Sequence, residues 1–512
     1  MRAHRVLVIG SGIAGLVSAL LLAARGLEVT VIERAATPGG KMRQVRVGGV
    51  SMDAGPTVFT MRWIFDEILA AAGTSLESML RLQPLGILAR HAWGPQTRLD
   101  LHADTRRSAE AIGDFAGAAE AHRFLEFCAE AKRVYRTLEG PYIRAPRPSL
   151  SSMTSALGIR GVGVLAGLGP FQSLWRTLSR HFRDPRLQQL FGRYATYCGS
   201  SPFLAPATLV LVAQVEMDGV WAVEGGMHAV AQAFAARAAQ AGATFRYGAE
   251  CAEILESHGR AIGARLGDGS VIEADSVVFN GDVAALAAGR MGPSATRSVA
   301  PPDPAGRSLS ALVWSINGHT RGFPLVRHNV FFDEDYASEF RDIFAHHRLP
   351  RRATVYVCAQ DRLDDDRPPG DAERLLCLVN APAIGDRAPL DPEELQRCET
   401  ASFSLMARYG LTIDRSADNT LLTTPAEFER LFPATGGGLY GQASHGWMAS
   451  FRRAESLSRL PGLYLAGGSA HPGPGVPMAA MSGRLAAEAL MAHLDSTSRS
   501  QRAVTSGGTS TP

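Results

Sequence analysis

The chain has 512 residues, of which 46% are hydrophobic and 20% charged, so it can bury a large core and is long enough for two domains. Its 52 Lys and Arg nearly balance its 49 Asp and Glu, and a net charge of +3 argues against nucleic acid as a partner. The six cysteines form no CxxC pair and no metal-binding cluster is apparent, so we expect reduced thiols in a cytoplasmic protein with no bound metal.

The first turn of the chain carries the clearest signal. An apolar strand at residues 5–9 runs into Gly10-Ser11-Gly12-Ile13-Ala14-Gly15, and a second strand ends at Glu33. Gly10 permits a tight turn, Gly12 lets the backbone approach a pyrophosphate, and Gly15 lets helix and strand pack closely. The amides at the helix start attract phosphate, and the Glu33 carboxylate can accept hydrogen bonds from a ribose. The pattern predicts a bound dinucleotide.

The next segment indicates which dinucleotide. A second glycine pair lies in Pro38-Gly39-Gly40-Lys41-Met42-Arg43, where a nicotinamide-binding domain would usually continue into a helix. Glycines beside Lys41 and Arg43 would bring backbone and positive charge to a longer cofactor. The pattern therefore favours FAD over NAD. The alternative is a hairpin with two surface cations.

Further along the chain, apolar spacing predicts helices from Asp66 to about Arg136, and prolines then interrupt the pattern. Residues 153–182 form an apolar, glycine-containing stretch. The nucleotide-binding pattern resumes near Gly219 with an alanine-rich helix, a strand, a hairpin and another strand that ends at Phe279.

The second half of the chain alternates strand-like runs with polar turns. The clearest runs are residues 310–317, 354–359 and 375–380, as expected for a separate sheet domain. A short apolar strand at 463–465 and a long helix to about residue 493 complete the pattern.

Together these segments predict an α/β protein with two domains. A Rossmann-like FAD-binding domain is assembled from residues 1–75, 215–285 and 460–494. Residues 76–214 and 286–459 form an inserted substrate and membrane-facing domain of helices and a mixed sheet, and residues 495–512 are expected to be a disordered tail. The ligand site should lie between the two domains.

Several motifs together resemble the bacterial carotenoid desaturase (phytoene desaturase-type) family, over nearly the whole chain to about residue 493. They are the opening turn, Pro38-Gly39-Gly40-Lys41, Asp53-Ala54-Gly55-Pro56-Thr57, Leu463-Tyr464-Leu465-Ala466-Gly467-Gly468 and His471-Pro472-Gly473-Pro474-Gly475-Val476-Pro477-Met478. Within this family the chain is most similar to the 1-hydroxycarotenoid 3,4-desaturases, also called hydroxyneurosporene desaturases. The segments that favour this subfamily are Thr60-Met61-Arg62, Arg193-Tyr194-Ala195-Thr196-Tyr197, Ser201-Pro202 and Gly219-Val220-Trp221.

The resemblance implies an FAD-dependent desaturation in carotenoid biosynthesis, in which C3 and C4 of a 1-hydroxy- or 1-methoxy-carotenoid each lose a hydrogen. The cofactor carries the redox step, while the protein holds the polyene against it and excludes water. Three alternatives stay open: a phytoene- or neurosporene-stage desaturase, an amine oxidase-like flavoprotein, and a prenyl-protein escort that needs no flavin. The sequence does not identify the final electron acceptor.

The resemblance also implies where the cofactor is held. The glycines of the first turn would meet the pyrophosphate, Glu33 the ribose, the backbone of Cys251 and Ala252 the adenine, and the loop after Gly468 the isoalloxazine. The predicted cofactor-binding residues are Gly10, Gly12, Ile13, Ala14, Gly15, Glu33, Arg34, Gly40, Lys41, Arg43, Ala54, Gly55, Pro56, Thr57, Cys251, Ala252, Gly468, Gly475, Val476, Pro477 and Met478.

A proton acceptor is harder to predict from the sequence. Asp53, Glu224, His445 and His471 lie in motif segments and are candidates, although each residue is more often structural in such places. A carbocation loses a proton with little assistance, so a dedicated base need not exist.

The implied substrate also predicts contact with a membrane. At about 0.8 kcal/mol per buried CH2, a long polyene cannot be released into water, so the enzyme should take it directly from the bilayer. We expect a cytoplasmic protein bound peripherally to the inner or photosynthetic membrane through residues 153–182, including Trp175 and Leu178. The alternative for this stretch is a buried helical pair. Residues 6–24 are uncharged, yet their glycines favour a βαβ unit over a membrane span.

Overall fold

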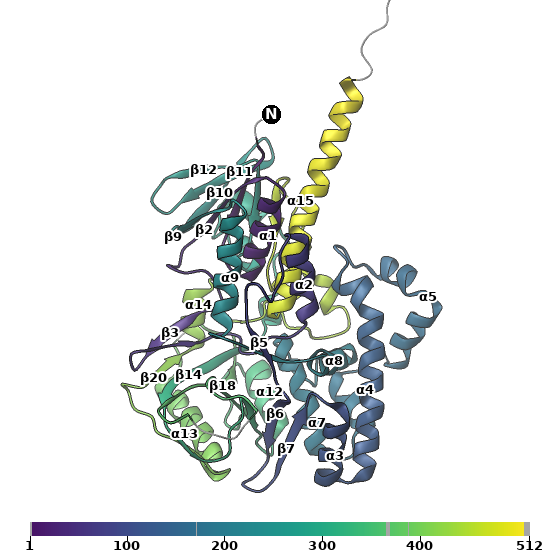
Figure 1. The fold of residues 1–512 in the computed structure, drawn as a ribbon, viewed down its shortest axis with the longest axis vertical. Coiled ribbons are helices and arrows are strands. Elements are labelled where there is room, and N and C mark those ends of the chain that lie inside the picture. The colour runs from purple at the N-terminus through teal and green to yellow at the C-terminus, as the bar shows by residue number, and fades with distance from the viewer. Residues whose placement is uncertain (1–2, 170, 365–368, 388, 506–512) are drawn as a thin grey trace, which may run out of the picture.

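A parallel sheet forms one half of the protein in the computed structural model, which describes residues 3–505 except 170, 365–368 and 388 (Figure 1). Its strand order is β21-β13-β1-β2-β9, and every pairing is parallel. The strands are β1 (Arg5–Ile9), β2 (Glu28–Glu33), β9 (Thr244–Tyr247), β13 (Ser276–Phe279) and β21 (Leu463–Leu465). Three distant stretches of the chain therefore build one sheet.

Helices α1 (Ile13–Ala24), α9 (Met227–Gln240) and α15 (Val476–Thr505) share one apolar core beside this sheet (Figure 1). α1 and α15 cross closely at Gly483, where a Cβ would lie 2.2 Å from the carbonyl oxygen of Ala14. The Ser18 hydroxyl donates to the Gly483 carbonyl oxygen at 2.8 Å and to that of Ala14 at 3.0 Å. This crossing brings the beginning of α15 to the beginning of α1.

One small antiparallel sheet extends the same half, and a hairpin reaches from it to the other half of the molecule (Figure 1). β10 (Cys251–Ser257), β11 (Arg260–Leu266) and β12 (Val271–Glu273) form a three-stranded sheet, and β3 (Gln44–Val47) pairs with β4 (Val50–Asp53). The start of β10 follows β9 directly, which places Cys251 at the edge of the half that contains the parallel sheet. We call this half the cofactor half.

A seven-stranded mixed sheet forms the other half, in the order β20-β14-β18-β17-β16-β6-β7. Its strands are β6 (Ile87–Ala92), β7 (Arg98–His102), β14 (Ser310–Gly318), β16 (His328–Phe331), β17 (Val355–Ala359), β18 (Glu373–Ala381) and β20 (Thr420–Thr423). The strands predicted at 310–317, 354–359 and 375–380 are confirmed as β14, β17 and β18. The helix α13 (Pro392–Arg408) packs on this sheet through a separate apolar cluster.

The prediction that residues 66 to about 136 are helical is wrong in its middle, where β6 and β7 lie. β6 is buried along almost its whole length, so it lacks the alternation of apolar and polar residues that identifies a half-buried strand. Helices occur on both sides of the pair: α2 (Arg62–Ala71) before it, and α3 (Thr105–Ala116) and α4 (Ala118–Leu138) after it.

Further helices form a layer with α3 and α4 along one side of the molecule (Figure 1). These are α5 (Leu150–Gly167), α6 (Leu174–His181), α7 (Pro185–Gly192) and α8 (Leu211–Met217), and rings of Phe124, Phe127, Phe182 and Phe191 pack at their centre. α5 lies on the outside and is broken at Gly158, whose φ is +59°. α5 is therefore a less regular helix than α4.

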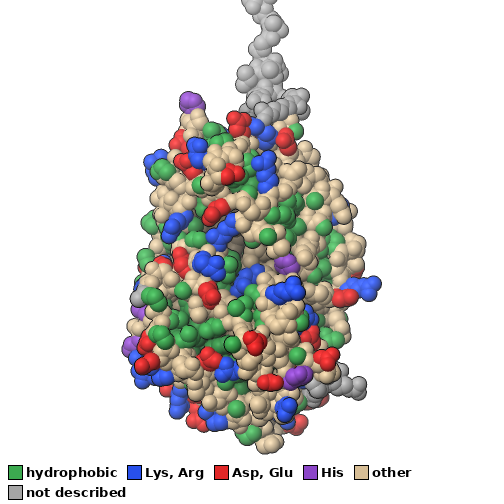
Figure 2. All heavy atoms as spheres, turned by 90° about the vertical axis from the view of Figure 1, so that its left-hand side faces the viewer, with side chains coloured by type: hydrophobic (Ala, Val, Ile, Leu, Met, Phe, Trp, Pro, Cys, Tyr) green, Lys and Arg blue, Asp and Glu red, His purple; other side chains and the backbone are tan. Residues whose placement is uncertain are grey.

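The C-terminal prediction needs a correction. α15 continues to Thr505, whereas the sequence predicts a disordered tail from residue 495; residues 506–512 lie outside the described part of the chain. No helix in the described residues combines the length and hydropathy needed to cross a bilayer. On the face drawn in Figure 2, basic and acidic side chains are interspersed.

Candidate active site

One large cavity, of about 1270 Å³, reaches from the loop after β1 to helices α5 and α8. Every residue that the sequence predicts at the cofactor lines it except Gly15, where a Cβ would lie 2.2 Å from the carbonyl oxygen of Gly10. Gly15 therefore serves the close packing of α1 on β1. The structure thus brings the N-terminal turn and the distal loop before α15 to the same space.

The N-terminal turn has the geometry of an anion site. Gly10 has φ +97°, and Gly12 caps α1 without any side-chain acceptor, so the first amides of the helix point to the cavity without a protein carboxylate or hydroxyl on them. A Cβ on Gly40 would lie 3.2 Å from the Cα of Gly12, so the two glycine turns are in backbone contact. The cradle fits a pyrophosphate.

Glu33 organises this turn. Its Oε2 accepts hydrogen bonds from the Ser11 amide at 2.8 Å and the Ser11 hydroxyl at 3.0 Å, and its Oε1 accepts from the Ala35 amide at 2.9 Å. Oε2 thus accepts two hydrogen bonds already, whereas Oε1 accepts one and keeps a lone pair for a ribose hydroxyl. The predicted contact between Glu33 and a ribose is thus compatible with the structure and stays a prediction.

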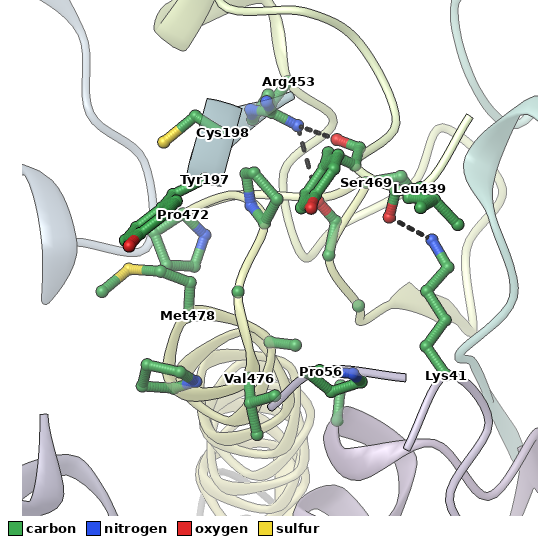
Figure 3. Close-up of a pocket in the computed structure, with 18 of the residues that line it drawn as sticks. Lys41, Pro56, Tyr197, Cys198, Leu439, Arg453, Ser469, Pro472, Val476 and Met478 are labelled. Atoms are coloured by element: carbon green, nitrogen blue, oxygen red, sulfur yellow. Dashed lines mark hydrogen bonds between the residues drawn. The ribbon is translucent and has the colours of Figure 1, made fainter. Parts of the chain in front are cut away.

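Lys41 and Arg43, the cations of the second glycine segment, form hydrogen bonds with residues far along the chain. The Lys41 ammonium donates to the carbonyl oxygen of Leu439 at 2.6 Å (Figure 3), and Arg43 donates to the Thr423 hydroxyl at 3.2 Å. Burial lowers the pKa of the Lys41 ammonium and that of the Arg43 guanidinium. Arg34 donates to the carbonyl of Leu431. These side chains line the cavity and also fasten its wall.

The opposite wall is the loop that carries Gly468 and Ser469. Arg453 points to it (Figure 3), with one nitrogen donating to the Gln442 carbonyl at 2.8 Å and another lying 3.5 Å from the Gly468 carbonyl oxygen. Burial lowers the pKa of Arg453, for which the described residues provide no ion pair. Sequence reasoning missed this residue because an isolated arginine in a loop carries no pattern.

The four candidates for a proton acceptor lie away from the cavity lining. Asp53 caps α9, accepting from the Met227 amide at 2.5 Å, and Glu224 is exposed, 4.0 Å from Arg81. These two carboxylates have structural or solvent-facing positions. Neither is placed to remove a proton from a molecule in the cavity.

The two histidine candidates are held in the same way. His445 Nε2 accepts from the Ser201 amide at 3.0 Å, and His471 Nε2 is hydrogen-bonded to the carbonyl of Ala145 at 2.8 Å. Burial lowers the pKa of both imidazoles to about 4, so both are neutral near pH 7. The hypothesis that one of these four groups is a base finds no support in the geometry.

The far part of the cavity is largely apolar and reaches the surface. Its wall includes Leu157, Leu165 and Val212. Val162 and Trp447 both line the cavity and are 40% and 43% exposed, so its mouth lies where α5 faces the loop around Trp447. A long apolar molecule can enter there and reach the cofactor cradle.

A cluster of charged and phenolic side chains interrupts this apolar wall. Arg193, Tyr197 and Glu216 line the cavity together with Tyr356. Sequence reasoning did not place these residues at the cavity, although the segment Arg193–Tyr197 was singled out as a subfamily signal. Glu216 lies on a different helix, and a sequence pattern does not show that the two segments meet.

A parallel dinucleotide-binding sheet, an uncapped helix start and a long apolar extension of the same cavity define a class of protein. It is an oxidoreductase in which cofactor and substrate share one cavity.

Comparison with known proteins agrees with this class. Residues 13–491 match the family described as flavin containing amine oxidoreductase, and the chain belongs to that family. It is 68% identical to the hydroxyneurosporene desaturase of Rubrivivax gelatinosus over 512 residues, covering 100% of this chain and 98% of the relative. It is 45% identical to that of Cereibacter sphaeroides, covering 97% and 99%. The predicted family and FAD as cofactor are confirmed.

The fold is also similar to that of a solved structure. An oxidoreductase from Methanosarcina mazei superposes with a TM-score of 0.58 at 17% identity, covering 94% of this chain and 99% of that one. The predicted fold class is therefore confirmed. The domain boundaries and the role of each cofactor-binding residue stay predictions.

Proposed function

We propose that the protein is an FAD-dependent desaturase that introduces the C3–C4 double bond into 1-hydroxy- or 1-methoxy-carotenoids such as hydroxyneurosporene. The observation that carries the proposal is the continuity of the cavity, which joins the anion cradle at Gly12 to an apolar channel that opens beside α5. The names of the full-length relatives supply the substrate class.

The residues present fit FAD. The amides of Gly12, Ile13 and Ala14 would hold the pyrophosphate, Glu33 the ribose, and the backbone at Cys251 the adenine. When bound, FAD supplies the two-electron acceptor for hydrogen removal. Val476 and Met478 lie in the first turn of α15 and line the cavity (Figure 3), where they would meet the isoalloxazine.

The protein itself positions the substrate and excludes water from the reacting carbons. Apolar side chains of α5 and α8 would hold the polyene straight and keep water from the reacting carbons. Each carboxylate that lines the cavity already has a partner in the protein. Glu33 and Glu216 accept hydrogen bonds, Asp282 accepts from the Ala284 amide at 3.0 Å, and Glu250 lies 3.9 Å from Arg34. We infer that proton loss from the oxidised polyene uses no dedicated base.

Peripheral membrane contact belongs to the same proposal, through an apolar patch at the cavity mouth. We define this mouth patch as Val162, Phe171, Leu204 and Trp447, which are 40%, 79%, 50% and 43% exposed. Phe171 and Trp447 form an edge-on pair with ring centroids 5.7 Å apart. Exposed apolar residues around an apolar opening fit transfer from a bilayer.

The docking residues expected from the sequence are not suitable. Leu178 is fully buried, and the ring of Trp175 packs at 4.6 Å from that of Phe203. The expectation for these two residues is therefore corrected, whereas Val162 and Phe171 of the mouth patch lie in the same predicted stretch, 153–182, and are exposed.

The test is incubation of the protein and FAD with liposomes that contain hydroxyneurosporene, neurosporene or phytoene. We expect anaerobic flavin bleaching and a red-shifted product with hydroxyneurosporene, because one more double bond joins the conjugated chain. Consumption of phytoene instead would assign the protein to the early desaturases. A protein that binds no flavin would contradict an oxidoreductase altogether.

A further inference from the structure

We propose that Arg193 and Tyr197 form a binding site for the tertiary hydroxyl of the substrate and thereby select 1-hydroxycarotenoids over their unhydroxylated precursors. This inference rests on the proposed function and deepens it, because it identifies the contact that sets the register of the polyene. We call these two residues the hydroxyl site.

The hydroxyl site is a charged group in an apolar wall. Arg193 begins the short helix Arg193–Cys198, and both residues of the site line the cavity. Burial disfavours the charge of Arg193, yet Tyr197, Tyr356 and Glu216 raise the pKa of its guanidinium above the ordinary value, so the group stays charged. A buried charge is costly unless hydrogen-bonded partners compensate for it.

The partners within the protein use only part of the guanidinium. Arg193 Nη1 donates to Tyr197 Oη at 2.8 Å, and its remaining donors form no hydrogen bond or ion pair with the described residues. The guanidinium carbon lies 5.1 Å from the ring centroid of Tyr197 and 5.1 Å from that of Tyr356. The two rings therefore hold the guanidinium in place while several of its N–H groups stay available.

Glu216 orients the tyrosine. Tyr197 Oη donates to Glu216 Oε1 at 2.7 Å, so its hydrogen is committed and it receives one bond from Arg193. A phenol oxygen in this state keeps one lone pair. The other carboxylate oxygen of Glu216 accepts from Tyr194 Oη at 2.6 Å, on the side away from the cavity lining.

The hydroxyl site thus offers one donor and one acceptor side by side. A substrate hydroxyl would accept from Arg193 and donate to Tyr197, which matches the hydrogen-bonding capacity of an alcohol. A 1-methoxy group would accept from Arg193 but has no hydrogen for Tyr197. An unhydroxylated end group would leave the guanidinium unpaired in an apolar cavity.

The hydroxyl site lies where a substrate must bind if its C3–C4 bond is to be the one oxidised. C3 is separated from the hydroxyl-bearing carbon by a single methylene, so a hydroxyl anchor must lie beside the reacting end of the cofactor. Tyr197, Pro472 and Met478 line the same cavity and are drawn together in Figure 3. Pro472 and Met478 belong to the segment that is proposed to meet the isoalloxazine. An anchor at this place stops a repetitive polyene from sliding to another carbon pair.

The experiment compares kcat/KM for hydroxyneurosporene and neurosporene in liposomes for the wild type, Tyr197→Phe and Arg193→Met. We expect the preference for the hydroxylated substrate to fall about 10-fold in Tyr197→Phe and about 10- to 100-fold in Arg193→Met. The 1-methoxy substrate should lose more in Arg193→Met than in Tyr197→Phe. Tyr194→Phe is the matched control, because it removes a phenol from the same carboxylate outside the cavity lining.

A binding measurement without turnover complements the kinetics. The desaturated product keeps its hydroxyl, and its binding can be followed through quenching of flavin fluorescence. We expect its affinity to fall in the two site variants and to be retained in Tyr194→Phe. Unchanged preference and product affinity in flavin-loaded Tyr197→Phe and Arg193→Met would overturn the inference while leaving the desaturase function intact. A wild type that desaturates neither carotenoid would overturn both.

Discussion

At the scale of single residues, the closeness of α1 and α15 depends on the missing side chain of Gly483. A Cβ there would lie 2.2 Å from the Ala14 carbonyl oxygen and 2.8 Å from its carbon, and neither backbone atom can move without shifting α1. The loop before α15 faces the turn at Gly12 because the two helices meet at this point. The contact therefore supports the shape of the cofactor site from behind the turn.

We predict that Gly483→Ala weakens flavin retention and lowers the free energy of unfolding by about 1–3 kcal/mol, because overpacking pushes α15 away from α1. Gly163→Ala in α5 is the control, since a Cβ at Gly163 meets nothing within 4 Å. The flavin-to-protein ratio after gel filtration and the urea midpoint measure the two effects. Equal values for the two variants would show that the helix crossing does not support the cradle.

The residue scale also shows where sequence reasoning succeeds. The turn at Gly10 and Gly12 could be predicted because a phosphate demands small residues at a fixed spacing within one short segment. The hydroxyl site could not, because Glu216 reaches Tyr197 only through the packing of two helical segments. Asp53 was a misleading candidate, since a carboxylate in a motif caps a helix as readily as it transfers a proton.

At the scale of elements, α5 differs from the helices behind it. It is broken at Gly158, lines the cavity through Leu157 and Leu165, and carries Val162 at the mouth. Its apolar composition was visible in the sequence, but the outward direction of its residues depends on how it packs against α4. For the same reason the buried strand β6 could not be separated from a helix by its pattern.

We predict that Phe171→Asp and Trp447→Asp each reduce co-sedimentation with liposomes several-fold, because a carboxylate in the mouth patch opposes insertion into the bilayer. Val271→Asp is the matched control: Val271 is 47% exposed on β12, at the far end of the cofactor half (Figure 1). All three variants should fold, since each side chain is exposed. Unaltered sedimentation of both mouth variants would exclude this patch as the docking surface.

At the scale of the whole molecule, four buried histidines link stability to pH. Burial lowers the pKa of His91 and His328 to about 3, and that of His445 and His471 to about 4, against 6.5 for a free imidazole. These groups are spread over both halves of the structure. The folded state keeps them neutral where the unfolded chain takes up protons.

The sign of the effect follows from linkage. Above pH 6.5 neither state binds these protons, so the stability is complete; as the pH falls below 6.5, only the unfolded state binds them, and stability declines until the folded pKa values near 3 to 4 are reached. We predict a loss of about 1 kcal/mol per histidine between pH 7.5 and 5.5, measured by urea denaturation with FAD present. His328→Asn should reduce this pH dependence by about one proton. Equal stability at the two pH values would contradict the prediction, because it would show that the folded protein takes up as many protons as the unfolded chain over this range.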